Sequence, residues 1–265
     1  MSAAGKRVVF AACARNCAAH LPAVLRNVER LGTLFADSAF VFVENDSTDG
    51  TRTILERWGG GRPHFNLFKL DGLAARIPQR TVRLELARNA CVEFIRVTPE
   101  LRSFDYVIVL DCDEVAEREF QLPRVVRALE FLEQQAAHAG VFANNVGPYY
   151  DMWALRFDAE CTPIPTAQAC RFVYGRGEPL VPVTCCFGGS GIYRMEAYRH
   201  GRYGTTDTEH VGFHRAMIDA GFARLFLNPS QILVYGRRHR FGDPFVAAVR
   251  RAWESMTGQP AVPWI

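Results

Sequence analysis

Lysine is nearly absent from this chain of 265 residues, which has only Lys6 and Lys69 and draws almost all of its positive charge from arginine. The net charge is only +3 at neutral pH, and the pI lies near 8.5. Nucleic-acid-binding domains usually concentrate a much stronger basic charge. We therefore expect no nucleic acid among the partners of this protein.

Long apolar runs are missing as well. No stretch of eighteen apolar residues occurs, so the sequence predicts no transmembrane segment. The opening residues, MSAAGKRVVFAACARNC, pass from two basic residues into an apolar run that is too short for a signal peptide. These absences lead us to expect a cytoplasmic protein. Its 49% hydrophobic and 22% charged residues suffice for one large domain or two closely joined halves.

Paired Cys-x-x-Cys spacing does not occur among the eight cysteines, at positions 13, 17, 91, 112, 161, 170, 185 and 186. The sequence therefore does not indicate a structural zinc site. We expect most of these thiols to be buried. In an oxidising compartment two disulfides could form, one between Cys13 and Cys17 and one between Cys161 and Cys170.

Strand and helix patterns alternate through the first half of the chain. β-Branched and aromatic runs predict strands at 7–14, 39–44, 64–70 and 104–114. Apolar residues at helical spacing predict helices at 19–32, 51–58 and 81–97. This βαβα progression is typical of parallel strands that are buried on both faces and bind ligands at their carboxyl ends.

The second half is less regular. Its patterns predict a helix at about 121–138, a strand at 140–146, a helix at 208–221 and a strand pair within 224–236. Between them, an aromatic stretch with glycine and proline predicts loops and short antiparallel strands. Its aromatic residues line either a substrate cleft or the core, and they include Tyr149, Tyr150, Trp153 and Phe157. We expect an α/β fold of one domain with two abutting halves, residues 1–118 and 119–265.

The segment NDSTDGTRTILE, residues 45–56, is close to a calcium-binding loop, with oxygen ligands at its first, third and fifth positions, glycine at the sixth and glutamate at the twelfth. Such a loop is entered from a helix, but the preceding AFVFVE has strand character. Its first position is Asn45 and its eighth is Arg52, both unusual for calcium. The pattern favours a strand-to-helix turn at a ligand crevice, with Thr48 or Asp49 as the helix cap.

The segment VIVLDCDEV, residues 107–115, gives the strongest chemical signal. Asp111 and Asp113 stand two positions apart on an extended segment, so they point to the same side with Cα atoms roughly 6 to 7 Å apart. Both can approach one divalent cation, directly or through water. The apolar residues before them place both at the mouth of the crevice. An acidic strand end that serves only solubility is the alternative.

Four motifs together resemble the GT-A glycosyltransferases, which transfer a sugar from a nucleotide diphosphate. They are FAACARN on the first strand, ENDSTDGT after the second, LARNA in the helix before the fourth, and LDCDE at its end. The chain resembles family 2 of these enzymes and, more weakly, the capsule-type mannosyltransferases in ENDSTDGT and CCFGG. The resemblance implies a Rossmann-like GT-A fold with a mixed, mainly parallel sheet, a nucleotide-diphosphate sugar donor, and a saccharide or other hydroxyl acceptor.

The resemblance also implies residues for the nucleoside. It places Ala12 and Arg15 near the base, and Glu44 or Asp46 on the base or the ribose, with Asp46 the better match in spacing.

For the diphosphate, the resemblance implies Arg88 of LARNA. Arg76, Arg80 and Arg83 approach the start of the same helix, where anions are favoured. We expect one or two of these four arginines to clamp the diphosphate.

The resemblance further implies Mn²⁺ or Mg²⁺ on Asp111 and Asp113, which makes Asp111 a donor-binding residue as well. The bound ion neutralises charge on the departing nucleotide. Glu114 either assists or forms an exposed salt bridge. His239 stands where many such proteins have a third metal ligand, and a basic surface loop is the alternative.

A general base is expected in TTDTEHVGFHRAMIDAG. Asp207 and Thr208 are predicted as helix caps, which places Glu209 in the first turn, where inverting GT-A enzymes hold their base. A simple first-turn acid that complements the helix dipole is the alternative. His210 and His214 stand at i, i+4, which is more often structural than a metal site.

Two other classes of function remain. A sugar-nucleotide nucleotidyltransferase usually opens with a glycine-rich loop, but AACARNCAAH contains no glycine. A degenerate, non-catalytic binding module is expected to lose its acids first, yet Asp111, Asp113 and Glu209 are all present.

Overall fold

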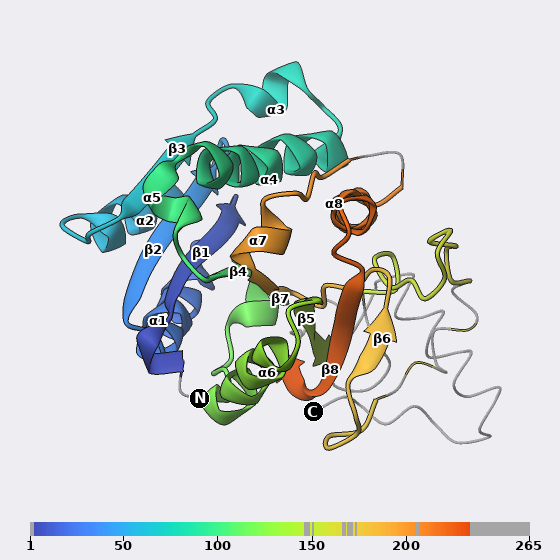
Figure 1. The fold of residues 1–265 in the computed structure, drawn as a ribbon. Coiled ribbons are helices and arrows are strands. Elements are labelled where there is room, and N and C mark those ends of the chain that lie inside the picture. The colour runs from blue at the N-terminus through green and yellow to red at the C-terminus, as the bar shows by residue number, and fades with distance from the viewer. Residues whose placement is uncertain are drawn as a thin grey trace, which may run out of the picture.

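The computed structural model describes residues 3–145, 149, 151–165, 168, 172, 174–204 and 207–233. Within these residues one sheet has eight strands, in the order β3-β2-β1-β4-β7-β5-β8-β6 (Figure 1). β7 is antiparallel to β4 and β5, and β6 is antiparallel to β8, whereas the other neighbours are parallel. The strands are β1 (Arg7–Ala14), β2 (Asp37–Glu44), β3 (Phe65–Lys69), β4 (Tyr106–Asp111), β5 (His138–Asn145), β6 (Val181–Val183), β7 (Ser190–Arg194) and β8 (Arg224–Leu233). The predicted mixed, mainly parallel sheet is confirmed.

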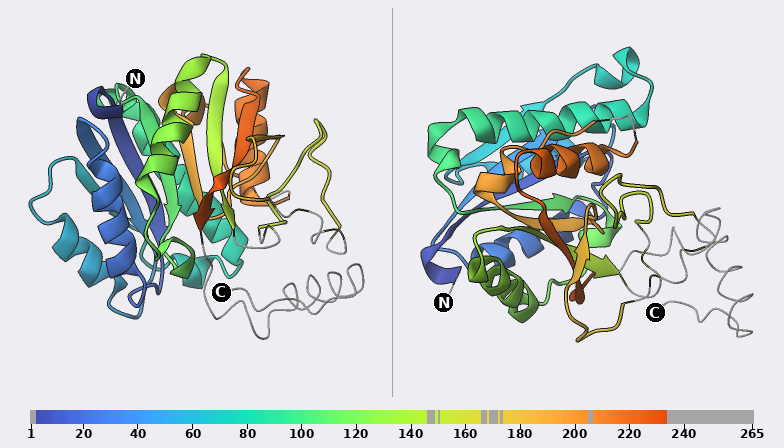
Figure 2. Two further views of the ribbon diagram at one scale, coloured as in Figure 1. Left: turned by 90° about the horizontal axis from the view of Figure 1, so that it is seen from below. Right: turned by 45° about the vertical axis from the view of Figure 1, so that its right-hand side comes forward.

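Helices cover both faces of this sheet (Figure 2). They are α1 (Leu21–Gly32), α2 (Thr51–Gly59), α3 (Leu73–Arg76), α4 (Arg80–Val97), α5 (Pro99–Arg102), α6 (Leu122–Gln134), α7 (Met195–Tyr198) and α8 (Glu209–Asp219), with short 3₁₀ turns η1 (Ala3–Gly5) and η2 (Glu114–Ala116). The right-hand view of Figure 2 shows α4 and α8 on one side of the sheet and α1 and α6 on the other.

The alternation of side chains along each strand explains why helices pack on both faces of the sheet. Val8 and Phe10 of β1 pack with the apolar residues of α1, α2 and α6. Val9 and Ala11, the residues that alternate with them, pack with those of α4, α7 and α8. Successive side chains of a strand point to opposite faces, so an uninterrupted apolar run is buried on both sides. This is why the strands of the first half could be predicted from short apolar runs.

The segment 45–56 is the connection between β2 and α2, so its entry from a strand is confirmed. Gly50 is the residue directly before the helix, and the side chain of the preceding residue, Asp49, bonds to the helix start. The Asp49 carboxylate accepts the backbone N–H groups of Thr51 and Ala18, each at 3.0 Å. Asp49 therefore fixes the helix start and ties it to the segment after β1.

Several predicted elements have different bounds in the structure. The strand expected at 104–114 ends at Asp111 because the chain turns into η2, and the helix expected to reach residue 138 ends at Gln134. The strand pair expected within 224–236 is wrong, because the described part of that segment is the single strand β8. Its register against β5 jumps from Asn228 to Ile232, so the intervening residues 229–231 form an irregularity within the strand and not a turn.

Seven of the eight cysteines are described, and all seven are free. Six are buried, as expected, and Cys13 is partly exposed. Cys13 and Cys17 therefore form no disulfide, and Cys170 lies outside the described residues. In the described ranges, no helix has the length and apolar character needed to span a bilayer.

Candidate functional site

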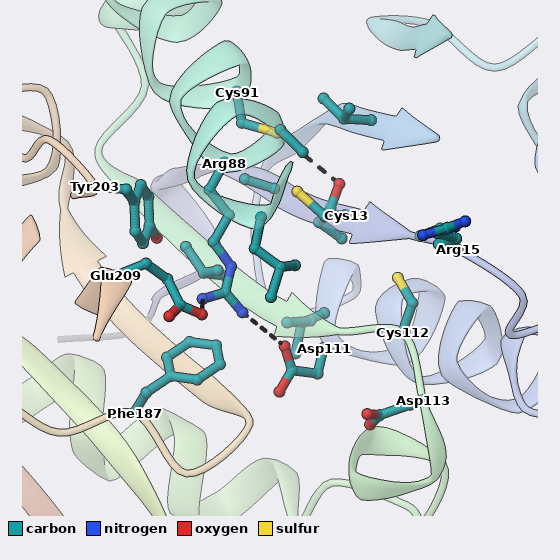
Figure 3. Close-up of a pocket in the computed structure, with 18 of the residues that line it drawn as sticks. Cys13, Arg15, Arg88, Cys91, Asp111, Cys112, Asp113, Phe187, Tyr203 and Glu209 are labelled. Carbon is teal, nitrogen blue, oxygen red and sulfur yellow. Dashed lines mark hydrogen bonds and ion pairs between the residues drawn. The ribbon is translucent and has the colours of Figure 1, made fainter. Parts of the chain in front are cut away.

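A cavity of about 670 Å³ opens at the carboxyl ends of β1 and β4, beside α4 and α8. Figure 3 shows the side chains that line it. The site residues expected from the sequence that line this cavity are Ala12, Arg15, Arg80, Arg83, Arg88, Asp111, Asp113 and Glu209, and Trp153 and His210 line it as well. The structure therefore brings together residues from both halves of the chain at the edge where parallel strands bind ligands.

Asp111 and Asp113 stand where β4 ends. The backbone N–H of Asp111 donates to Gly189 O at 3.0 Å, which extends the contact between β4 and the segment before β7. Asp113 Oδ1 accepts the N–H of Val115 at 3.1 Å and so begins η2. Both carboxylates are thus positioned by backbone contacts at the mouth of the cavity (Figure 3).

Arg88 joins the two ends of the site. From α4, its Nη2 donates to Asp111 Oδ1 at 3.2 Å, and its Nη1 donates to Glu209 Oε1 and His210 Nε2, each at 2.6 Å. Its guanidinium carbon lies 5.5 Å from the centre of the Phe187 ring. The paired carboxylates hold the pKa of Arg88 above its usual value despite its burial. The side chain predicted to touch phosphate therefore also bridges the predicted metal ligand and the predicted base.

Carboxylates gather around Arg88 in one part of the cavity. Burial, and then the charge of Asp113, raise the pKa of Asp111 above its usual range, while Arg88 opposes them. Burial also raises the pKa of Asp151, another lining residue, to about 6, against a backbone N–H that acts in the opposite direction. With Asp113 and Glu209, four carboxylates line this cavity, and two of them, Asp111 and Glu209, pair with the buried Arg88 guanidinium. Such a cluster favours a cation or a hydrogen-bond donor as its ligand.

His210 and His214 have different surroundings, which disfavours a shared metal. His210 stacks on Phe187 with ring centres 4.0 Å apart, and burial and Arg88 hold its pKa well below the usual value. His214 lies 3.0 Å from both Tyr193 Oη and Cys185 Sγ, and burial lowers its pKa to about 3. Both are therefore neutral side chains within the core.

The acid that ends β2, Glu44, and the acid two residues further on, Asp46, are occupied by contacts within the chain. Glu44 is 0% exposed, and its carboxylate accepts Ser47 N–H at 2.7 Å and Arg52 Nε at 2.5 Å. Asp46 accepts the N–H groups of Gly72 and Ala74, each at 2.6 Å, which also lower its pKa. Both side chains shape the loops beside the cavity, and their contact with a nucleoside stays a prediction. His239 lies outside the described residues.

The arginines around the start of α4 differ in their surroundings. Arg80 and Arg83 line the cavity. Arg83 Nη1 donates to the carbonyls of Ile77 and Pro78, each at 2.6 Å, so it also stiffens the turn before α4. Arg76 donates to two backbone carbonyls of its own turn. Among these three, Arg80 and Arg83 are placed to meet an anion in the cavity.

Asp207, predicted as a helix cap, holds a buried arginine instead. Arg156 is 1% exposed, and its Nη2 lies 3.0 Å from both carboxylate oxygens of Asp207. The same guanidinium donates to the carbonyls of Leu155 and Cys161 at 2.9 and 2.8 Å. Thr208 is the residue before α8, and its side chain makes no capping bond. Arg156 therefore ties the turn that carries Asp151 to the start of α8.

We expect Arg156→Ala to lower the free energy of unfolding by roughly 3 to 5 kcal/mol, because it leaves buried carbonyls and a carboxylate without their donor. Asp207→Asn should cost less, since its side chain is 31% exposed and water can replace part of the contact. Urea unfolding of both variants measures the difference. Equal midpoints for Arg156→Ala and the parent protein would contradict the clamp.

The fold and the acidic cavity at the strand ends together define a protein of the GT-A class. The model of glycosyl transferase family 2 matches residues 10–202, which is most of the chain. The chain belongs to glycosyl transferase family 2. No curated protein matches it.

Solved structures share the fold at low sequence identity. A mannosyltransferase from Pyrobaculum calidifontis, in complex with GDP-mannose and Mn²⁺, is 14% identical with a TM-score of 0.54, over 98% of this chain and 66% of that one. TarS from S. aureus, in complex with UDP-GlcNAc, is 13% identical with a TM-score of 0.52, over 90% and 60%. This chain thus spans slightly less than two thirds of either protein, and at these identities the likeness shows the GT-A fold alone.

Sequence reasoning missed two features of this cavity. It did not identify Asp151, which stood in the aromatic stretch without a spacing that linked it to other acids. Arg88 was predicted only as a phosphate ligand, because the contact between Arg88 and Glu209 joins residues 121 positions apart. The acidic cluster in LDCDE and the helix start at Glu209 were the local signals that sequence could supply.

Proposed function

We propose that this protein transfers a sugar from a nucleotide-diphosphate donor to a hydroxyl acceptor, with Asp111 and Asp113 as the ligands of a divalent cation and Glu209 as the general base. The observation that carries this proposal is the bridge through Arg88, which lies 3.2 Å from Asp111 and 2.6 Å from Glu209. The proposed metal ligand and the proposed base therefore border one cavity, and they are close enough for a single guanidinium to contact both.

The donor set fits Mn²⁺ or Mg²⁺. Among the described residues, no group of three or more His, Cys, Asp or Glu side chains could hold a metal by itself. Mg²⁺ in phosphate-transferring sites is commonly held by one or two carboxylates together with substrate phosphates and water. Asp111 and Asp113 supply such a pair. Burial, and then the charge of Asp113, raise the pKa of Asp111, and a bound cation would favour its ionised form. When bound, the ion neutralises the charge that develops on the departing nucleotide.

The donor would bind at the end of the cavity where arginine side chains form a basic rim. Ala12 and Arg15 at the end of β1 line the wall where we place the nucleoside. Arg80 and Arg83 lie at the start of α4, where backbone N–H groups and the helix dipole favour an anion. We assign the diphosphate to this rim. Arg88, with its two carboxylate partners, keeps the acids apart and oriented.

Glu209 would take the proton of the acceptor hydroxyl. Its bond to Arg88 fixes the orientation of the carboxylate, and its place in the first turn of α8 holds it at the cavity wall. A base that is positioned in this way typically contributes on the order of 10²- to 10⁴-fold to the rate. Neutral His210 is a poorer candidate, because burial and Arg88 both disfavour its protonated form.

The alternatives have less support. A nucleotidyltransferase would be expected to cradle phosphates with a glycine-rich loop, which AACARNCAAH after β1 lacks. A non-catalytic relative would have no need to keep Asp111, Asp113 and Glu209 on one cavity.

A thermal-shift screen of UDP-, GDP- and dTDP-sugars, each with and without Mn²⁺, tests the proposal and identifies the base of the donor. A ligand at a hundredfold excess over its dissociation constant adds about 2.7 kcal/mol to the stability. We expect one class of nucleotide sugar to raise the melting temperature, and to do so only with Mn²⁺. If none raises it, or if Ca²⁺ alone protects the β2–α2 loop from proteolysis, the proposal is wrong.

A further inference from the structure

Trp153 is an exposed aromatic side chain at the edge of the cavity. Its exposed fraction is 62%, and it lines the cavity that also contains Asp111 and Glu209. Its neighbours Met152 and Leu155, by contrast, are only 3% and 0% exposed. Exposure of so large an apolar side chain is unfavourable in water, so a ligand that covers its ring would gain free energy.

The turn that carries Trp153 is firmly anchored. The N–H of Ala154 donates to Asp151 O at 3.1 Å, and Asp151 Oδ2 accepts the N–H of Gly188 at 3.2 Å. Two residues further on, Arg156 pairs with Cys185 across an isolated bridge and with Asp207 through its guanidinium. The indole is therefore held at the rim by a turn whose other residues are fixed in the core, which limits the entropy that binding must overcome.

This turn lies beside the start of α8. The contact between the Arg156 guanidinium and the Asp207 carboxylate fixes this neighbourhood. Asp151 and Glu209 line the same cavity as Trp153. An acceptor that covers the indole can therefore present a hydroxyl group toward the proposed base.

An aromatic face next to a carboxylate suits a sugar ring. The C–H groups on one face of a pyranose carry partial positive charge and pack on the negative face of an aromatic ring, while the hydroxyls at its edge donate to a carboxylate. A phosphate on the acceptor would meet repulsion from Asp151 and Glu209, because Arg80 and Arg83 are assigned to the donor diphosphate and Arg88 is already paired with two carboxylates. A hydrocarbon acceptor would offer Asp151 no donor beyond the backbone N–H groups that it already accepts, and covering a carboxylate in this way is costly.

We propose that Asp151 and Trp153 form the acceptor subsite of this cavity and that it binds a neutral saccharide, with a pyranose face on Trp153 and a hydroxyl on Asp151. This inference rests on the glycosyl transfer proposed above. In that step the acceptor oxygen bonds to C1 of the donor sugar as the bond from C1 to the phosphate oxygen breaks. The nucleoside diphosphate leaves with the electron pair, and the hydroxyl proton passes to the Glu209 carboxylate.

Acceptor kinetics with a panel of methyl glycopyranosides test the inference, with the donor found in the thermal-shift screen. Sugar transfer to the glycoside is measured against its concentration. We expect Trp153→Ala to raise the KM for the best glycoside about tenfold or more. Trp153→Phe, which keeps an aromatic ring, should raise this KM much less. Trp153→Leu, which is apolar but not aromatic, should remain defective. Phe157→Ala, which removes another exposed aromatic residue of the same region, is the matched control and should behave as the parent protein.

The donor-induced thermal shift separates this inference from the proposed function. We expect Trp153→Ala to keep the Mn²⁺-dependent shift while the KM for the glycoside rises. If the parent protein binds donor but Trp153→Leu or Trp153→Ala has the parental KM, the acceptor subsite is wrong and the proposed function stands. Transfer to glycerol phosphate or to a long-chain alcohol, with none to any glycoside, would likewise overturn the subsite. No donor-induced shift in the parent protein would reject both.

Discussion

The Glu209→Gln variant is expected to transfer sugar about 10²- to 10⁴-fold more slowly than the parent protein, because an amide cannot accept the acceptor's proton. Its side-chain oxygen can still accept the hydrogen bond that Arg88 Nη1 makes at 2.6 Å, so the side chain should keep its orientation. Donor and metal affinity should therefore change little. Steady-state transfer kinetics, together with the donor-induced thermal shift, measure these two properties separately.

Glu196→Gln is the matched control for this variant. Glu196 also lies in the first turn of a helix, α7, and it is exposed to solvent. Its replacement should leave transfer unchanged. If Glu209→Gln transfers sugar at the parental rate, Glu209 only complements the helix dipole. A retaining mechanism with no enzymic base at this position would then be the better account.

Asp111→Asn and Asp113→Asn are each expected to lose most of the Mn²⁺-dependent nucleotide binding. A carboxylate is a much stronger ligand for a divalent cation than an amide, and the pair provides the protein's proposed ligands. Under conditions where the donor stabilises the parent protein by about 2.7 kcal/mol, most of that gain should disappear. Isothermal titration with the nucleotide, with and without Mn²⁺, measures the loss directly.

The two aspartate variants should differ in their effect on the unliganded protein. Asp113→Asn keeps an oxygen that can accept the Val115 N–H, so its melting temperature without ligand should remain near the parental value. Asp111→Asn removes one of the two charged partners of Arg88 and should perturb the site itself. Full Mn²⁺-dependent affinity in both variants would show that the metal ligands have been assigned wrongly.

The elements of the first half were predictable because each one leaves a pattern in the sequence that local physics explains. Apolar residues at helical spacing mark α1 and α4, and continuous apolar runs mark β1, β2 and β4, which are buried on both faces. β6 and β7 have only three and five residues, too few to set a period. Short antiparallel strands were expected in that region, but their positions depend on long-range pairing with β8, β4 and β5.

Site residues could be predicted where their position follows from the neighbouring sequence. Asp111 and Asp113 follow a buried strand, so their position at the mouth of the cavity follows from the sequence. The partners of Arg88 and of Asp151 could not be predicted in the same way, because they are brought together only by the packing of α4, α8 and the turn after β5. The hydrogen bonds that occupy Asp46 depend likewise on the exact course of the loop before α3.

Several expectations from the sequence stay predictions. They include the division of the chain at residue 118, the role of His239, and the cytoplasmic location. The single sheet joins both halves, since β4 of the first half pairs with β7 of the second.

Release of nucleoside diphosphate by the purified protein is the sharpest test of the proposed metal-dependent sugar transfer. The protein is incubated with the nucleotide sugar chosen by the thermal-shift screen, and the released diphosphate is quantified with Mn²⁺, with EDTA, and for the Asp113→Ala variant. We expect steady release with Mn²⁺ that increases when an acceptor is added and that is abolished both by EDTA and by Asp113→Ala. Release that is unaffected by EDTA and by Asp113→Ala, or no release from any nucleotide sugar that binds, would contradict it.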